Sequence, residues 1–336
     1  MSMAKKIIVT VILVAYTLFG LAQDIYFSQF YAAPLLMNPA LTGFYPGDMQ
    51  VGLNYRNSTN GFIPASTYAA SADIKIAKRV IKPNIFALGL VSAIDNVSKG
   101  LVSSTNLLAS GAYHICMDKR KFHYLSFGAQ IGMLERQFNP DDFTYDVQWD
   151  HNTGFHADWP THENFQIQQA YNFDWNMGFF WYSHLPRYSA LFIGSSVFHL
   201  HEPKQSFLGK DEHFTRRILI HGGNRIGFNQ EFSLIPQFMV MLQNRSQQII
   251  EGLTMEYRIR DTETAFRFGS WFRHSDNSII FSAGFRASGV QFGLSSDFIS
   301  PIQKESRTRG AMEFSVVVSP TFTRQSKLSA DPTRIF

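Results

Sequence analysis

The chain has 336 residues, of which 45% are hydrophobic, 15% aromatic and only 17% charged, and its formal net charge is +4. Charged residues are scarcer than the ~25% of an average soluble domain, yet a mean hydropathy of −0.10 excludes a bundle of membrane helices. The basic residues are scattered rather than gathered with aromatic side chains, which argues against a nucleic-acid partner. The single cysteine, Cys116, excludes an intramolecular disulfide.

Residues 1–22 have the pattern of a signal peptide. Lys5 and Lys6 precede the apolar run Ile7–Phe19, and Gly20-Leu21-Ala22 supplies a small-x-small cleavage site. This run is shorter than the ~20 residues that a spanning helix needs, so a signal peptide is favoured over an anchor helix. We expect a mature protein that starts at Gln23 and is periplasmic, secreted or inserted in an outer membrane.

Residues 23–47 show neither strand alternation nor an amphipathic helical pattern. Asn-Pro and Thr-Gly are ordinary turn signals, but Ile25, Leu35 and Leu36 make the segment too apolar for a free tail. We therefore expect it to pack against the rest of the chain, either as a plug or as a turn that docks a partner. The candidate residues are Phe27, Ser28, Gln29, Phe30, Asn38, Pro39, Ala40 and Gly43.

From Met49 onward the dominant period is two, which predicts strands. About fourteen alternating stretches follow, each roughly ten residues long, which suits a tilted strand that crosses a bilayer better than a globular strand. One face of these stretches is rich in Phe and the other carries charges such as Arg56, Asp73 and Glu313. In a membrane barrel the polar face lines the lumen. The sequence therefore predicts an all-β, transmembrane antiparallel barrel of about fourteen strands over residues 48–320, with 23–47 packed in or under it.

The lengths of the connections predict the orientation. The long ones, 135–171, 199–215 and 300–310, each join an odd-numbered strand to the next even one, whereas the even-to-odd turns are short. Outer-membrane barrels have short periplasmic turns and longer outer loops. We therefore expect an outer-membrane location with periplasmic termini, including a periplasmic tail at 321–336.

The loop 135–171 holds many carboxylates and histidines, which could bind a hard cation such as calcium. However, Asp150-His151-Asn152-Thr153-Gly154 has its glycine too early for a calcium loop, no Glu closes that loop, and the spacing fits no zinc motif. A solvated surface loop pinned by aromatic residues, without a metal, is the favoured interpretation. The candidates for contact with a partner protein are Trp149, Asp150, His151, Phe155 and Trp159.

Catalytic motifs are not found: the chain has no nucleophile elbow, no His-Glu-x-x-His and no phosphate loop. We therefore expect no enzyme and no cofactor. Lumen charges such as Arg267, Arg273 and Asp297 could select a solute, but mutual pairing is the favoured interpretation.

Several short motifs resemble one family. They are Gln23-Asp24, Phe27-Ser28-Gln29-Phe30, Asn38-Pro39-Ala40, Gly43, Asn54-Tyr55-Arg56, Ser71-Ala72-Asp73 and the segment HLHEPKQSF at 199–207. Together they resemble the PorP/SprF family of type IX secretion system outer-membrane proteins from Bacteroidota, over essentially the mature chain. The chain departs from the family pattern at Asn57-Ser58-Thr59, where Asn-Gln-Trp is usual, and in its final residues, which lack the usual cysteine.

The resemblance implies a role in exporting or anchoring a large cell-surface protein, in some members a gliding adhesin. On this basis we expect the outer loops to bind the C-terminal domain of a secreted cargo protein, and the periplasmic segments to meet other secretion or gliding machinery. Two alternatives remain open: a channel or transporter for a small solute or apolar ligand, and a scaffold that holds no cargo.

Overall fold

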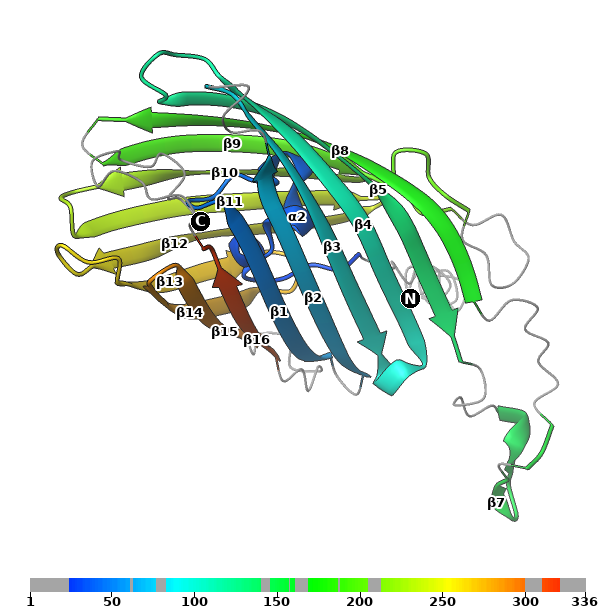
Figure 1. The fold of residues 1–336 in the computed structure, drawn as a ribbon. Coiled ribbons are helices and arrows are strands. Elements are labelled where there is room, and N and C mark those ends of the chain that lie inside the picture. Colours follow the sequence, from blue (N-terminus) through cyan, green and yellow to red (C-terminus); the bar gives the residue numbers. More distant parts are fainter. Residues whose placement is uncertain are drawn as a thin grey trace, which may run out of the picture.

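The alternating stretches form antiparallel strands that close into one barrel of fourteen strands (Figure 1). The computed structural model describes residues 24–60, 63–76, 83–139, 146–156, 158–160, 169–186, 188–204, 213–299 and 310–320. The expected signal peptide and C-terminal tail therefore lie outside the described residues. The barrel strands are β1 (Met49–Asn60), β2 (Ile63–Ile76), β3 (Ile85–Val97), β4 (Val102–Cys116), β5 (His123–Phe138), β8 (Gln169–Leu185), β9 (Ser189–Phe198), β10 (Arg217–Gly227), β11 (Phe232–Gln243), β12 (Ser246–Arg258), β13 (Ala265–Arg273), β14 (Ser278–Ala287), β15 (Val290–Ile299) and β16 (Gly310–Val318).

Each strand pairs with its neighbours in sequence, and β1 pairs with β16 to close the barrel. The register of this seam places Arg56 opposite Glu313 and Tyr55 opposite Phe314. Since a closed sheet leaves no unpaired edge, every strand meets the bilayer with its backbone groups satisfied. The predicted barrel is confirmed.

The two faces of the wall separate side chains as the alternation predicts. Phe268 and Phe281 are each 54% exposed on the outer face, whereas Asp174 and Glu256 on the inner face are fully buried. Glu251 is an exception, because it lies on the outer face, where its carboxylate contacts the ring of His274 at 3.0 Å. The outer surface is thus suited to lipid over most of its area.

The two ends of the barrel differ in their connections. The turn end carries the even-to-odd connections, such as 117–122 and 228–231, and the loop end carries the long ones at 139–168, 199–216 and 300–309. Part of the first long loop forms η5 (Asp146–Gln148) and a two-stranded hairpin of β6 (Trp149–Asp150) and β7 (Gly154–Phe155), which lies away from the barrel in Figure 1. A short helix, η3 (Ser98–Gly100), also lies at the loop end. By the outer-membrane pattern, we expect the turn end to be periplasmic.

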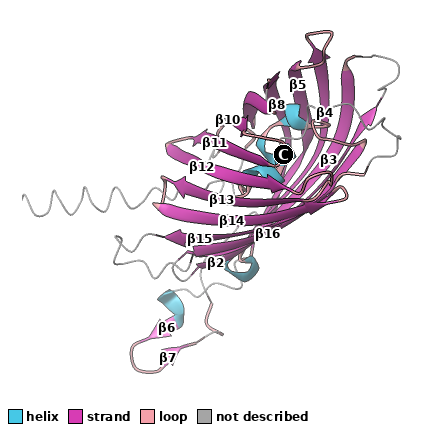
Figure 2. Cartoon of the chain, turned by 90° about the vertical axis from the view of Figure 1, so that its left-hand side faces the viewer, coloured by secondary structure: helices cyan, strands magenta, loops and turns pink. Residues whose placement is uncertain are grey.

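Residues 24–48, here called the plug segment, run through the lumen from the loop end to the turn end. They contain η1 (Phe30–Ala32), α2 (Pro34–Met37) and η2 (Pro39–Leu41), which lie inside the barrel in Figure 2. Asp24 contacts His199 at the loop end, and the N–H of Asp48 donates to the carbonyl of Pro320 at the turn end. None of the helices in the described part of the chain is long and apolar enough to cross a membrane.

The core lies between the plug segment and the wall. Phe30, Met37 and Phe44 of the plug pack against inward side chains of the strands, which form one buried cluster with them. The wall residues of that cluster include Phe180, Phe192, Met239, Ile250 and Trp271. We expected a polar lumen, and this part of it is instead apolar, because it must bury an apolar segment.

Candidate functional site

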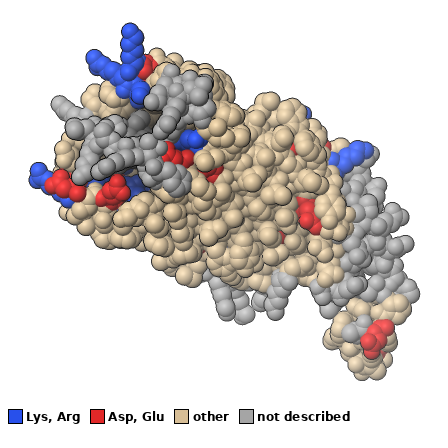
Figure 3. Space-filling view, in the orientation of Figure 1, with Lys and Arg blue, Asp and Glu red and all other residues tan. Residues whose placement is uncertain are grey.

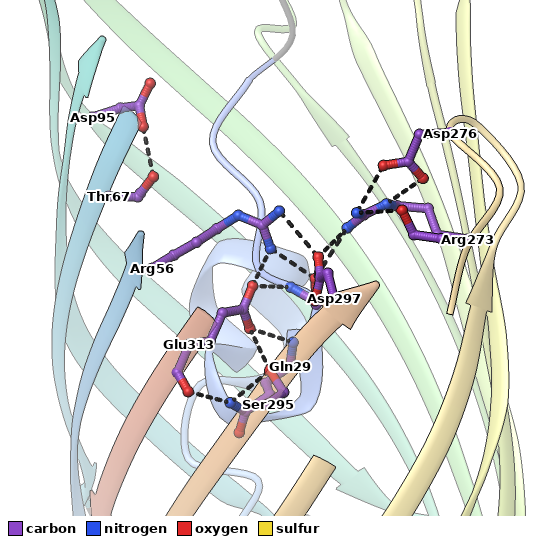
Figure 4. Close-up of polar contacts among 11 residues, drawn as sticks. Gln29, Arg56, Thr67, Asp95, Arg273, Asp276, Ser295, Asp297 and Glu313 are labelled. Atoms are coloured by element: carbon purple, nitrogen blue, oxygen red, sulfur yellow. Dashed lines mark hydrogen bonds and ion pairs between the residues drawn. The ribbon is translucent and has the colours of Figure 1, made fainter. Parts of the chain in front are cut away.

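The first part of the site is the set of polar anchors that hold Ser28 and Gln29. The backbone N–H groups of both residues donate to the carboxylate of Glu313, at 2.6 and 2.8 Å, and the hydroxyl of Ser28 donates to Asp297 at 2.9 Å. The side-chain amide of Gln29 donates to Ser295 at 3.1 Å. The plug backbone is thus bound by carboxylates of β15 and β16, as Figure 4 shows for the contacts of Gln29.

Two arginines of the wall complete this cluster (Figure 4). Arg56 forms ion pairs with Asp297 and Glu313, and Arg273 contacts Asp297 at 2.8 Å. Both guanidinium groups also lie over the ring of Tyr26, at 5.2 and 5.9 Å from its centroid. Buried charges are tolerated only when they are paired and hydrogen-bonded. Here the plug segment supplies part of that pairing, because the ring of Tyr26 contacts both arginines and the N–H groups of Ser28 and Gln29 donate to Glu313.

The Asn38-Pro39-Ala40 turn is fitted to a strip of wall that has no side chains. The side-chain carbonyl of Asn38 caps η2 by accepting from the N–H of Ala40 at 2.9 Å, and its amide donates to the carbonyl of Phe179 at 2.8 Å. A Cβ atom at Gly128 would overlap with the backbone of Pro39 and Ala40, and one at Gly178 would overlap with Asn38. The turn therefore lies in direct contact with the strand backbones.

Gly43 ends the helical part of the plug. Its φ of +78° is in the left-handed region that favours glycine, and a Cβ atom there would overlap with Ala87. Its N–H donates to the carboxylate of Asp73 at 2.6 Å. One residue earlier, the carbonyl of Thr42 contacts the ring of His114 at 2.8 Å. This position thus fixes the plug to β2 and β4.

The start of the plug segment forms a separate ionic contact at the loop end. Asp24 contacts His199 at 2.6 Å and Arg217 at 3.6 Å, and His199 also contacts Asp174 at 3.0 Å. Burial alone would lower the pKa of His199, but the carboxylates of Asp24 and Asp174 outweigh it and raise that pKa to about 9. Burial alone would raise the pKa of Asp24, but His199 and Arg217 hold it well below its usual range. The contact is therefore a charged pair at neutral pH.

The second part of the site is the β6–β7 hairpin. Trp149, Phe155 and Trp159 are 63%, 44% and 41% exposed, and the ring of Trp159 stacks on His156 with centroids 4.5 Å apart. The carboxylate of Asp150 accepts from the N–H groups of Asn152 and Thr153 at 2.8 and 2.9 Å, and these bonds lower the pKa of Asp150. Asp150 thus closes the turn, and the hairpin displays aromatic rings outward.

The carboxylates of this loop do not converge within the described residues. In that part of the chain, no group of three His, Cys, Asp or Glu side chains is placed to hold a metal ion. Asp141, Asp142, His162 and Glu163 lie outside the described residues.

The eight plug candidates from the sequence lie along one continuous segment, and all of them are in the lumen. All eight are buried, with Asn38 and Ala40 at 0%. The five outer-loop residues, Trp149, Asp150, His151, Phe155 and Trp159, lie together on or beside the hairpin, far from the plug in Figure 1. Sequence reasoning missed the wall partners of the plug. The charged residues of the inner faces, such as Arg56 and Glu313, were the only signal for them.

Comparison with known proteins identifies both the sequence family and the fold. Residues 20–318 match the family model described as "Type IX secretion system membrane protein PorP/SprF". No curated protein matches the chain. Among solved structures, the CymD monoaromatic hydrocarbon channel is similar, with 11% identity, a TM-score of 0.51, and coverage of 90% of this chain and 95% of that one. The Ralstonia pickettii toluene transporter TbuX has 10% identity, a TM-score of 0.49, and coverage of 85% and 92%. At 11% identity, the likeness to CymD shows the barrel fold alone.

Proposed function

The chain belongs to the PorP/SprF family of type IX secretion system membrane proteins, and from that membership we propose that it helps to export and anchor a large cell-surface cargo protein. It is an outer-membrane barrel. In the proposed role it binds the C-terminal secretion domain of the cargo at the loop end, and it does so without catalysis. A gliding adhesin is one such cargo.

The observation that carries this proposal is the exposed aromatic hairpin on the loop end. Trp149 is 63% exposed on a short two-stranded unit that lies away from the barrel in Figure 1, and Trp159, which follows this unit in the sequence, is 41% exposed. Exposed tryptophans that cluster on a protein surface are typical of the anchors that dominate protein–protein binding. Their place at the loop end, which the pattern of loop lengths predicts to be the outer one, suits a cargo protein that has left the translocon.

The filled lumen supports a holding role over a channel role. Phe180, Ile250 and Trp271 of the wall are 0–2% exposed, because the plug segment covers them. A plug held at both ends by charged or polar contacts is suited to a barrel that stays closed. The channel alternative rests on the fold likeness alone, and conductance in planar bilayers tests it: a steady pore would favour the channel.

Cargo binding is tested by replacing the exposed rings, as Trp149→Ala with Trp159→Ala. We expect the tagged variant to insert normally, to recover less cargo in a detergent pull-down, and to leave less cargo on the cell surface. The matched control is Tyr188→Ala, which removes a 51% exposed ring at the turn end. Equal cargo recovery from wild type, control and hairpin variant would refute the role of the hairpin.

The pull-down also separates cargo holding from a scaffold that has no cargo. A holder recovers a secreted protein with a C-terminal secretion domain, whereas a scaffold recovers envelope proteins alone. Normal surface display of the cargo after deletion of the gene would refute export and anchoring altogether.

A further inference from the structure

The first residues of the plug segment, 24–27, here called the mouth segment, are held differently from the rest. Residues 24–26 are partly exposed at the loop end, whereas residues 27–30 are buried. From Ser28 onward, the plug segment is bound by buried carboxylates of β15 and β16 and then lies directly against the strand backbones. The part of a chain with the fewest buried contacts opens most readily, so the mouth segment can open while the rest stays in place.

The wall binds the mouth segment through groups that any polypeptide offers. The side-chain oxygen of Gln243 accepts from the backbone N–H of Asp24 at 3.2 Å, and Arg217 donates to the carbonyl of Ile25 at 3.2 Å. The carboxylate of Asp24 contacts His199 at 2.6 Å and Arg217 at 3.6 Å. These wall side chains therefore form a site that binds a backbone N–H, a backbone carbonyl and one carboxylate.

The charges of this site balance only when a carboxylate occupies it. A third cation, Arg136 of β5, acts on the carboxylate of Asp24 through its charge, as the two cations in direct contact do. Two further carboxylates act on these cations: Asp174, which contacts His199 at 3.0 Å, and Asp95, which acts on Arg136. Three cations thus face three carboxylates among the described residues, and removal of Asp24 leaves an excess of one positive charge.

Two cavities flank the mouth segment and give the site room for other side chains. One, of about 320 Å³ including space open to solvent, is lined in part by Ile25, Met239 and Met241. The other, of about 290 Å³ measured in the same way, is lined in part by Ile25, Leu108 and Leu134. Methionine side chains adapt to different shapes. The apolar part of the site therefore suits apolar side chains that differ in size from that of Ile25.

We propose that an extended segment of the cargo, with a carboxylate followed by apolar side chains, displaces the mouth segment and binds in its place, while the plug segment from Ser28 onward stays in the lumen. The mouth segment itself shows which chain fits, since Asp24 and Ile25 occupy the site. In Figure 3 most of the wall is tan and the charged side chains gather toward its two ends, so a charged segment meets its partners at an end. The contacts to backbone groups favour a polypeptide over a small solute.

This inference deepens the proposed function, on which it rests for the identity of the polypeptide as cargo. In this arrangement the exposed hairpin binds the C-terminal domain of the cargo, and the mouth of the lumen binds an extended segment beside it. The hairpin and the mouth are separate sets of residues, so binding at one can be lost while binding at the other persists.

The test uses the full-length protein, purified in detergent, and a fluorescent hexapeptide with the sequence of residues 23–28 as the probe. Wild type should bind the probe weakly, because the mouth segment competes within the same molecule. Asp24→Asn should bind it about tenfold tighter or more, since that change weakens the internal competitor. Addition of Arg217→Gln to Asp24→Asn should reverse the gain, and a probe with Asn in place of its Asp should show no gain.

The matched control is Glu251→Gln, which breaks a carboxylate–histidine contact on the outer face, where the side chain of Glu251 is 60% exposed. It should change binding less than about twofold. Equal binding by wild type and Asp24→Asn would overturn the proposal, and is the result expected if another carboxylate, such as Asp211 or Glu212, fills the site instead. Displacement of the probe by an equal concentration of acetate would also overturn it, because a lone carboxylate would then suffice.

A spin-label measurement shows how much of the plug segment is displaced. In a protein that carries Cys116→Ser, a label at Ile25→Cys should become more mobile at saturating probe, whereas a label at Pro46→Cys, which is partly exposed near the turn end, should not change. A gain of mobility at both positions would overturn the proposal, because the whole plug segment would then leave. Probe binding without cargo in the pull-down would refute the proposed function and leave this site standing, and cargo recovery without probe binding would do the reverse.

Discussion

The fit between the Asn38-Pro39-Ala40 turn and the wall predicts that a single methyl group can dislodge the plug. In Gly128→Ala, the new Cβ atom would lie well inside the 3.0 Å from backbone atoms that Cβ atoms essentially never approach, and those atoms belong to Pro39 and Ala40. The plug must then move as a unit, because no flexible side chain is available to yield. Overpacking of this kind costs about 1–3 kcal/mol.

That free energy should be visible as an opening of the plug. If opening is fast compared with cleavage, the rate of proteolysis follows the open population, so a destabilisation of about 1–3 kcal/mol raises it roughly 5- to 150-fold. The assay is limited chymotrypsin digestion of the detergent-solubilised protein, with cleavage after the plug aromatics Phe30 and Phe44 followed by mass spectrometry.

The matched control is Gly111→Ala in the neighbouring strand. Its Cβ atom would face outward, with Leu88 Cδ2 as the nearest neighbour at 3.4 Å, which is ordinary contact. The control should match wild type in cleavage rate. If Gly128→Ala matched it too, the turn would not be held against the wall and the reasoning would be wrong.

Three further predictions follow from the site. Glu313→Gln should destabilise the barrel by about 3–5 kcal/mol in urea unfolding, because it leaves Arg56 and the plug N–H groups without their carboxylate, whereas Glu251→Gln on the outer face should change little. Trp271→Ala should cost about 3–5 kcal/mol by the same assay, since the ring is 2% exposed and packs on Phe30 at 5.3 Å, and Trp175→Ala, at 37% exposed, should cost less. The contact of His199 with Asp24 should be complete between pH ~4 and ~6.5 and should weaken as the pH rises through about 9, because a raised histidine pKa stabilises only while the ring is protonated. A spin label attached at Ile25→Cys, in a protein that also carries Cys116→Ser, should become more mobile as the pH rises through about 9. The variant His199→Gln should abolish this pH-dependent change in mobility.

The strands could be predicted because lipid imposes one strict rule on every second residue. Phe268 and Phe281 face outward, and the period of two is unbroken over the late strands, which shows where these strands lie in the sequence. The parity of the long loops predicts that the three long connections lie together at one end of the barrel, as they do. The inner face follows no such rule, because it carries both charged and apolar side chains.

The contacts between the plug segment and the wall could not be predicted, because they join residues that are far apart in the chain. Ser28 bonds to Asp297 and Glu313, which are 269 and 285 residues away. No local pattern marks such a pair. The alternation places Phe179 and Trp181 on the outer face and so leaves Phe180 and Tyr182 on the inner one, but it does not show that the inner pair packs against the plug segment. The apolar character of residues 23–47 predicted that they must pack, but not which wall they would meet.

The charged cluster around Ser28 also sets an order of assembly. Arg56 belongs to the first strand, and Asp297 and Glu313 belong to the last two, so the cluster spans the β1–β16 seam from inside. Trp271 and Phe180 are buried because the plug segment packs against them, so the interior is complete only when the plug segment is in place. Because Glu313 of the last strand contacts both Arg56 of the first strand and the N–H groups of Ser28 and Gln29, closing the seam and holding the plug segment depend on the same side chain. Contacts of such long sequence separation form late and slowly, so the seam is where folding of this protein finishes.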